Sequence, residues 1–154
     1  MLSWIGWGLL MGASMAAQII NFGWKWSLLG IIFSTIGCFA IALAAFLKGN
    51  FSVIKRDWLF LFLGFTCIGL YYITEDPWLT TIYSVTADLA IGIPTIVKTI
   101  QNRQTEKTHG WTLSLISWSL TLTISFHHDI LFAVFPIYLF SYSLMTVFLI
   151  RWRR

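Results

Sequence analysis

Charged residues are scarce in this sequence of 154 residues. Only 10% of them are Asp, Glu, Lys or Arg, whereas a soluble domain typically has about 25%. Hydrophobic residues make up 58% and aromatic residues 18%, more apolar surface than one globule of 17.7 kDa can bury. The composition therefore argues against a soluble domain and predicts a chain whose apolar faces meet lipid.

Long apolar runs account for this composition. Each is about as long as a helix needs to cross a hydrocarbon core of about 30 Å, and the runs lack the alternation of barrel strands. The sequence predicts an all-α integral membrane protein with six transmembrane helices. The expected spans are residues 2–20, 26–47, 58–74, 78–100, 111–126 and 130–150.

Cysteine and clustered chemical groups are also scarce. Cys38 and Cys67 fall inside expected spans without a metal-ligand pattern, so we interpret them as small packing residues without a disulfide. His127, His128 and Asp129 are adjacent on a short turn, where neighbouring side chains rarely converge on one ion, so no metal site is expected. The sequence lacks a nucleophile with its base and a phosphate-binding glycine loop. It gives no support for an enzyme or for a cofactor.

The few charges are distributed unevenly. Nine of the ten cationic residues follow spans two, four and six, and only Lys25 lies on the other side. Because cytoplasmic loops are enriched in Lys and Arg, this asymmetry predicts a multi-pass protein of the cell membrane (inner or plasma) with both termini in the cytoplasm. The net charge of +4 therefore favours the lipid bilayer over nucleic acid as a partner. The first run lacks the basic segment and cleavage pattern of a signal peptide, and we expect it to remain as a helix.

Asp88 lies near the middle of span 78–100 and is the one carboxylate expected at the bilayer midplane. At that depth a carboxylate costs at least about 2.5 to 3.5 kcal/mol, and no Lys or Arg lies at a comparable depth. Asp88 is then either protonated and hydrogen-bonded to another helix, or ionised against water, a cation or a substrate. Its face of the helix also carries Thr81, Ser84, Gly92, Thr95 and Thr99.

Pro94 lies inside the same span, two residues after Gly92. Proline removes a backbone donor and bends a helix, and a nearby glycine makes bending easier. The sequence predicts a kink here, which is either a fixed packing kink or a moving hinge.

Spans one and five carry similar polar stripes. A shift of 111 residues superposes Ser3 on Ser114 and Trp7 on Trp118, which is a weak internal repeat, and a shift of 114 residues competes with it. Such stripes should face protein or a water-filled cavity rather than lipid. They either line a cavity or hydrogen-bond neighbouring helices, and the sequence leaves both interpretations open. The stripe of span one consists of Ser3, Trp7, Ser14, Gln18 and Asn21.

The segment from Ile93 to Ile100, followed by Thr105 to Gly110 and a helix bearing serine and tryptophan, resembles the PQ-loop transporter superfamily. That superfamily includes the SWEET and SemiSWEET sugar carriers. Pro94 corresponds to the proline of their shared motif. The first helix of its seven-span pattern has no counterpart here, so the resemblance implies a 2+1+3 arrangement. Residues 1–50 would form an incomplete half-bundle of two spans, 51–77 a linker span, and 78–154 a complete three-helix bundle. The chain would then be a truncated gene model, a natural six-span variant, or a protein that completes its first bundle by association into a homo-oligomer.

The resemblance further implies a small-solute transporter, facilitative or proton-coupled, with alternating access around a pocket near the midplane between the half-bundles. Pro94 takes the place of the hinge proline, with Gly92 beside it. Two tryptophans facing a cavity suit a flat, partly apolar solute such as a sugar, nucleoside or vitamin. The residues of this pocket implied by the resemblance are Trp7, Trp118, Ser3 and Ser114, and the polar faces of the spans add Asp88, Gln18 and Ser84.

A different class of function remains open. The chain is alternatively a non-transporting membrane protein, such as an assembly subunit or the remnant of a transporter, whose polar stripes only hold helices together. A cavity at Asp88, Trp7 and Trp118 would favour transport. Stripes buried against neighbouring helices would favour the alternative.

Overall fold

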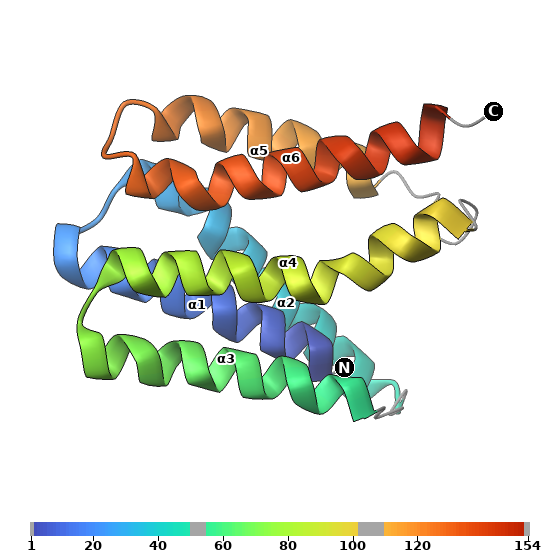
Figure 1. The fold of residues 1–154 in the computed structure, drawn as a ribbon, viewed down its shortest axis with the longest axis horizontal. Helices are drawn as coiled ribbons and strands as arrows, with labels where there is room; N and C mark the ends of the chain where they lie inside the picture. Colours follow the sequence, from blue (N-terminus) through green and yellow to red (C-terminus); the bar gives the residue numbers. More distant parts are fainter. Residues whose placement is uncertain (1, 50–54, 102–109, 153–154) are drawn as a thin grey trace.

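The computed structural model of the protein describes residues 2–49, 55–101 and 110–152. These residues form six α-helices and one short 3-10 helix, without a strand (Figure 1). The all-α prediction is confirmed, and the expected runs agree with the helices to within a few residues. The helices are α1 (Leu2–Phe22), α2 (Leu29–Leu47), α3 (Lys55–Thr74), α4 (Pro77–Gln101), α5 (Gly110–Ser125) and α6 (Leu131–Trp152), and the 3-10 helix η1 is Trp26–Leu28.

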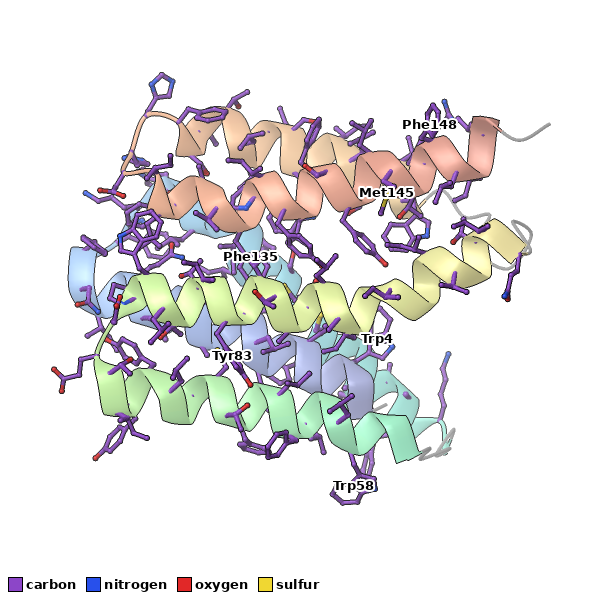
Figure 2. The ribbon with its side chains drawn as sticks, viewed as in Figure 1. Trp4, Trp58, Tyr83, Phe135, Met145 and Phe148 are labelled. Carbon is purple, nitrogen blue, oxygen red and sulfur yellow. The ribbon has the colours of Figure 1, made fainter. Side chains whose placement is uncertain are left out.

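Three segments of the described residues are long and apolar enough to cross a membrane: Trp4–Phe22, Trp26–Leu47 and Leu131–Arg151. A shorter apolar stretch, Leu61–Thr74, lies in α3. The outer faces of α2 and α3 expose large hydrophobic side chains, and Trp58 points away from the other helices (Figure 2). Exposed apolar surface of this extent is stable in lipid but not in water. The apolar helices therefore fit a protein embedded in a membrane.

α4 is less apolar than these three segments although it is long enough to cross a bilayer. It has 25 residues, about 1.5 Å of rise each, but its threonines and Asp88 lower its hydropathy. α5 has 16 residues and is the shortest of the six. Each of the six predicted spans coincides with a helix. Three of the described helices have the length and hydropathy expected of a membrane span.

α1 lies between α2 and α3 and also contacts α4 (Figure 1). α6 contacts both α4 and α5, and η1 connects the start of α2 with α5 and α6. α4 therefore joins a group of helices around α1 to the pair α5 and α6. The yellow, C-terminal part of α4 runs at an angle to its green part, as the kink predicted near Gly92 and Pro94 requires (Figure 1).

α3 packs closely against α1 through Gly64. A methyl group at Gly64 would lie 2.8 Å from Cβ of Leu9 and 3.2 Å from the carbonyl oxygen of Gly6, both on α1. Small residues allow helix backbones to approach in this way. One face of the expected linker span is therefore tightly packed, while its other face, with Phe62 and Phe65, stays exposed.

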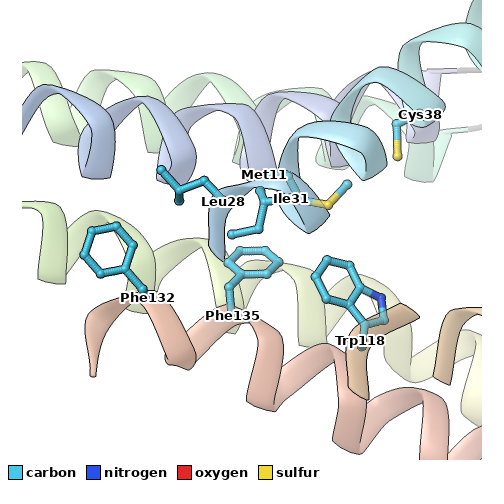
Figure 3. Close-up of a cluster of buried hydrophobic side chains, with 7 residues drawn as sticks. All are labelled: Met11, Leu28, Ile31, Cys38, Trp118, Phe132 and Phe135. Atoms are coloured by element: carbon cyan, nitrogen blue, oxygen red, sulfur yellow. The ribbon is translucent and has the colours of Figure 1, made fainter. Parts of the chain in front are cut away.

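Two clusters of buried apolar side chains hold the helices together. The central cluster joins α1, η1, α2, α5 and α6 (Figure 3). The second cluster, called the α4 cluster here, joins α1, α3 and α4. Cys38 and Cys67 lie in different clusters and are both free, and their burial confirms the predicted packing role. The central cluster consists of Met11, Leu28, Ile31, Cys38, Trp118, Phe132 and Phe135, and the α4 cluster of Leu10, Ala13, Cys67, Ala87 and Ile91.

Candidate functional site

Asp88 lies on the part of α4 that meets α6, and its residue surface is only 8% exposed. The hydroxyl group of Tyr138 on α6 donates a hydrogen bond of 2.5 Å to Oδ2 of Asp88. This length is typical of a hydroxyl that bonds a charged carboxylate. Lys25, Lys48 and Arg151, the basic residues whose side chains are described, lie at helix ends rather than in the middle of α4.

A second hydrogen bond connects the same two helices one turn further on. The hydroxyl group of Tyr142 donates to the carbonyl oxygen of Gly92 at 2.9 Å. Because residues 88 and 92 and residues 138 and 142 have the same spacing of four, α4 and α6 run parallel and are bonded at successive turns. We call these two bonds the tyrosine ladder.

Gly92 provides the space that the Tyr142 ring occupies. A methyl group at position 92 would lie 2.7 Å from Cε2 of Tyr142 and 3.0 Å from its hydroxyl oxygen. Any larger residue would push the ring away from α4, since real Cβ atoms do not approach other atoms so closely. The predicted hinge residue therefore has a packing role that its sequence context did not indicate.

The two tyrosines of the ladder belong to a row of four aromatic rings. The ring centroid of Tyr138 lies 6.1 Å from that of Phe135 and 6.1 Å from that of Tyr142, whose centroid is 5.7 Å from Trp111. Phe135 lies between α6 and α4 in Figure 2. These four rings, called the aromatic row below, extend from the central cluster to the first turn of α5.

Trp7 and Trp118 approach the same region from α1 and α5. Trp118 belongs to the central cluster, and Trp7 and Tyr138 both pack against it. Trp7 also packs against the α4 cluster, which contains Ala87, the residue before Asp88. The indole Nε1 of Trp7 is buried and has no hydrogen-bond partner among the described residues. The two tryptophans predicted to line one pocket thus both belong to or pack against the central cluster, as Tyr138 of the tyrosine ladder does.

The polar stripe of α1 instead pairs with α4. Ser14 Oγ lies 3.0 Å from Thr81 Oγ1, and Nε2 of Gln18 donates to Thr81 Oγ1 at 3.1 Å and to Ser14 Oγ at 3.4 Å. All three residues are fully buried. The two hydroxyls and the amide N–H group bond one another, as groups that hold two helices together do. The amide oxygen Oε1 of Gln18 is buried and has no hydrogen-bond partner among the described residues.

Ser84 and Ser114 also take part in helix contacts. Ser84 donates to the carbonyl oxygen of Leu10 at 3.1 Å and lies 2.9 Å from Sγ of Cys67, so it connects α4 with α1 and α3. Ser114 Oγ lies 3.0 Å from Ser143 Oγ and joins α5 to α6. Trp7 and Trp118 thus share the central cluster with Tyr138, the partner of Asp88, whereas Gln18, Ser84 and Ser114 bond residues of neighbouring helices. The side chains of Ser3 and Pro94 lie outside the described residues.

Tyr138 and Tyr142 belong to the polar residues of span 130–150 that the sequence makes candidates for lining a cavity, but their pairing with Asp88 and Gly92 was not predicted. A usable signal exists, because the spacing between the two tyrosines matches the spacing between Asp88 and Gly92 on the parallel helix. A spacing of four also occurs by chance, so the match gains meaning only when the two helices are known to be neighbours.

This arrangement can hold a proton or a positive charge at Asp88 and can present ring faces next to it. Among the described residues, no group of three or more His, Cys, Asp or Glu is placed to hold a metal ion. Comparison of the chain with protein-family models, curated proteins and solved structures gives no match in any of the three. The function must therefore be inferred from the geometry at Asp88.

Proposed function

We propose that the protein is a small-solute membrane transporter that works by alternating access, either facilitative or proton-coupled. The observation that carries this proposal is Asp88, a buried carboxylate in the middle of α4 that Tyr138 holds from another helix. A carboxylate at the bilayer centre costs at least about 2.5 to 3.5 kcal/mol. A hydrogen bond to a charged group contributes about 1.5 to 3 kcal/mol, so the bond from Tyr138 offsets this cost only in part. Helix packing alone does not offset that cost, and a transported proton or solute gives Asp88 a reason to be there.

The proposed architecture has six membrane spans in the 2+1+3 order of the PQ-loop superfamily. Support comes from α6, which contacts both α4 and α5, as the third helix of a three-helix bundle would. The parallel course of α4 and α6 agrees with two spans that both run from the outside inward. The distribution of Lys and Arg supports cytoplasmic termini in a cell membrane.

The proposed pocket lies near the midplane, with Asp88 on one side and Trp7 and Trp118 on the other. Protonation of Asp88 would turn the bond from Tyr138 into a neutral one, and neutral hydrogen bonds are about half as strong as charge-assisted ones. Proton binding would thereby loosen the contact between α4 and α6. The bend of α4 near Gly92 and Pro94 is the place where the two halves of the proposed carrier would rock.

The second candidate is a non-transporting integral membrane protein, such as an assembly subunit. The contacts of Ser14 and Gln18 with Thr81 favour it, because these stripe residues are fully buried between α1 and α4. On this alternative Asp88 is a neutral acid that only ties α4 to α6.

A screen followed by vesicle uptake tests the proposal. Purified protein is screened by thermal shift against sugars, nucleosides, vitamins and amino acids, and the stabilising solutes are tested for uptake into reconstituted vesicles. We expect uptake above that of empty vesicles for at least one solute, and its loss in Asp88→Asn. Glu75→Gln is the matched control, because Glu75 is an exposed carboxylate in the turn between α3 and α4.

The Asp88→Asn protein should keep its fold, since the amide oxygen of asparagine can still accept a hydrogen bond from Tyr138. Normal size-exclusion behaviour and thermal unfolding of this variant are the control for folding. Absence of uptake for every solute would favour the non-transporting alternative. Unchanged uptake by Asp88→Asn would remove this carboxylate from the mechanism.

Orientation is tested separately by cysteine labelling. In a variant with Cys38→Ala and Cys67→Ala, a single Lys107→Cys should react with a membrane-impermeant maleimide only from the cytoplasmic side. The positive-inside rule gives this expectation. Labelling from outside intact cells would overturn the proposed topology.

A further inference from the structure

We propose that the site at Asp88 binds an organic cation, with an ammonium group held between the Asp88 carboxylate and the rings of Tyr138 and Tyr142. This inference rests on the proposed function, because the same site is the proposed transport pocket. It adds the chemical class of the solute. Three observations support an organic cation: the charge of Asp88, the aromatic row and the unpartnered donor of Trp7.

The first support is charge. Asp88 is buried, and its one described partner, the Tyr138 hydroxyl, is a neutral donor. The side chains of Lys25, Lys48 and Arg151 are at helix ends, away from the middle of α4. A carboxylate kept ionised at that depth requires a positive charge nearby, and a cationic solute brings one.

The second support is the aromatic row. Neighbouring ring centroids in it are 5.7 to 6.1 Å apart. A cation is attracted to a ring face within about 6 Å of the centroid, and the attraction is largest where water is excluded. An ammonium group that contacts both Asp88 and the face of Tyr138 is therefore also close to Tyr142.

The third support is the indole of Trp7. Its buried Nε1 donor has no partner among the described residues, and Trp7 packs against both the central cluster, as Tyr138 does, and the α4 cluster, which contains Ala87. A buried donor without a partner destabilises the protein, because it has lost its hydrogen bond to water and gained none in return. An oxygen on the solute, such as a hydroxyl or carbonyl group near the ammonium, would accept this hydrogen bond.

A metal ion fits this site less well than an organic cation. Ca²⁺ takes six to eight oxygen ligands, and Mg²⁺ requires six in an octahedral arrangement. The partner of Asp88 that the structure describes is the Tyr138 hydroxyl, and no group of three or more His, Cys, Asp or Glu that could hold a metal ion occurs among the described residues. Ring faces bind quaternary and protonated amines, which need no such oxygen shell.

A pair of probes of equal shape tests the inference. Binding of choline and of its neutral carbon isostere, 3,3-dimethylbutan-1-ol, is measured by tryptophan fluorescence on the purified full chain. We expect choline to bind at least about tenfold more tightly, a difference within reach of one desolvated carboxylate with ring faces. Asp88→Asn should abolish this preference, whereas Glu75→Gln should retain it.

Tetramethylammonium, which has no oxygen, tests the role of Trp7. Trp7→Phe keeps an aromatic ring but removes the N–H donor, so it should weaken choline binding and leave tetramethylammonium binding unchanged. Equal binding of choline and its isostere, or no binding of either cation, would overturn the proposal. So would a preference for choline that persists in Asp88→Asn.

Failure of this inference is distinguishable from failure of the proposed function. Uptake of a neutral solute that depends on Asp88, without cation binding, would retain the transporter and reject the organic cation. Cation binding that depends on Asp88, without uptake of choline or any screened solute into vesicles, would retain the binding site and reject transport.

Discussion

The two faces of α4 differ in the kind of polar group that they bury. Toward α1, Thr81 meets Ser14 and Gln18, and all the bonding groups are neutral hydroxyls and an amide. Toward α6, Asp88 and Gly92 accept hydrogen bonds from two tyrosines, and one acceptor is a carboxylate. Neutral groups that satisfy one another are inexpensive to bury in a membrane, whereas a carboxylate is not.

This difference indicates which face packing explains and which it does not. The contact between α1 and α4 is made of neutral groups, and of these only the amide oxygen Oε1 of Gln18 is buried without a hydrogen-bond partner among the described residues. Its burial is less costly than that of a carboxylate. The contact between α4 and α6 contains a group whose burial costs more than its one bond returns. Tyr138, which bonds this carboxylate, belongs to the aromatic row, and Trp7 with its unpartnered donor packs against the same central cluster as Tyr138. The functional hypothesis therefore belongs to the face of α4 that meets α6.

The largest expected change in stability comes from Tyr138→Phe. Removing the donor leaves Asp88 without its described partner, and hydrogen bonds to charged groups contribute about 1.5 to 3 kcal/mol. The decrease in the free energy of unfolding is measured on the purified protein in mixed detergent micelles. The same substitution made in Asp88→Asn should cost less, because the acceptor there is neutral. An equal loss in both backgrounds would mean that Asp88 is already neutral.

Gly92→Ala should destabilise the protein by about 1 to 3 kcal/mol, the usual cost of forcing extra atoms into a packed contact. The added methyl group would displace the Tyr142 ring and its bond to α4. Gly69→Ala is the matched control, because a methyl group there would meet no atom within 4 Å. Equal free energies of unfolding for the two variants would show that the Tyr142 ring does not pack against Gly92.

Thr81→Val should have a smaller effect, about 0.6 kcal/mol, the average for a hydrogen bond between membrane helices. The substitution keeps the shape of the side chain and removes the hydroxyl that Ser14 and Gln18 share. Solute uptake should stay near the wild-type level when it is compared at equal amounts of folded protein. Loss of uptake in Thr81→Val would move the α1 stripe into the pocket and remove the distinction between the two faces of α4.

The smallest effect is expected for Ser114→Ala. Ser114 bonds Ser143 between α5 and α6 and is only part-buried, so its removal should change stability by less than about 0.6 kcal/mol. Unchanged uptake would assign Ser114 to helix packing. A strong loss of uptake with normal unfolding would instead support the pocket role that the family resemblance implies.

Individual residues show how far the sequence could predict the site. Asp88 was identifiable because the cost of a carboxylate in lipid depends on its depth, which its position in the run indicates. Gln18 and Ser84 were expected at a pocket, but a polar stripe looks the same whether it faces a cavity or another helix. Gly92 was expected at a hinge because glycine bends easily, and its contact with Tyr142 was not visible in the sequence.

The sequence alone determined that the chain is helical, that its apolar helices fit a membrane, and where the described helices lie to within a few residues. Hydropathy is a local property, since each run must itself cover the apolar thickness of a bilayer and close its own backbone hydrogen bonds. Only the tertiary structure decided that Tyr138, fifty residues after Asp88, is the partner of this carboxylate. Which helix faces meet depends on how the helices rotate and pack against one another, and that is a sum of many small contacts that no single segment specifies.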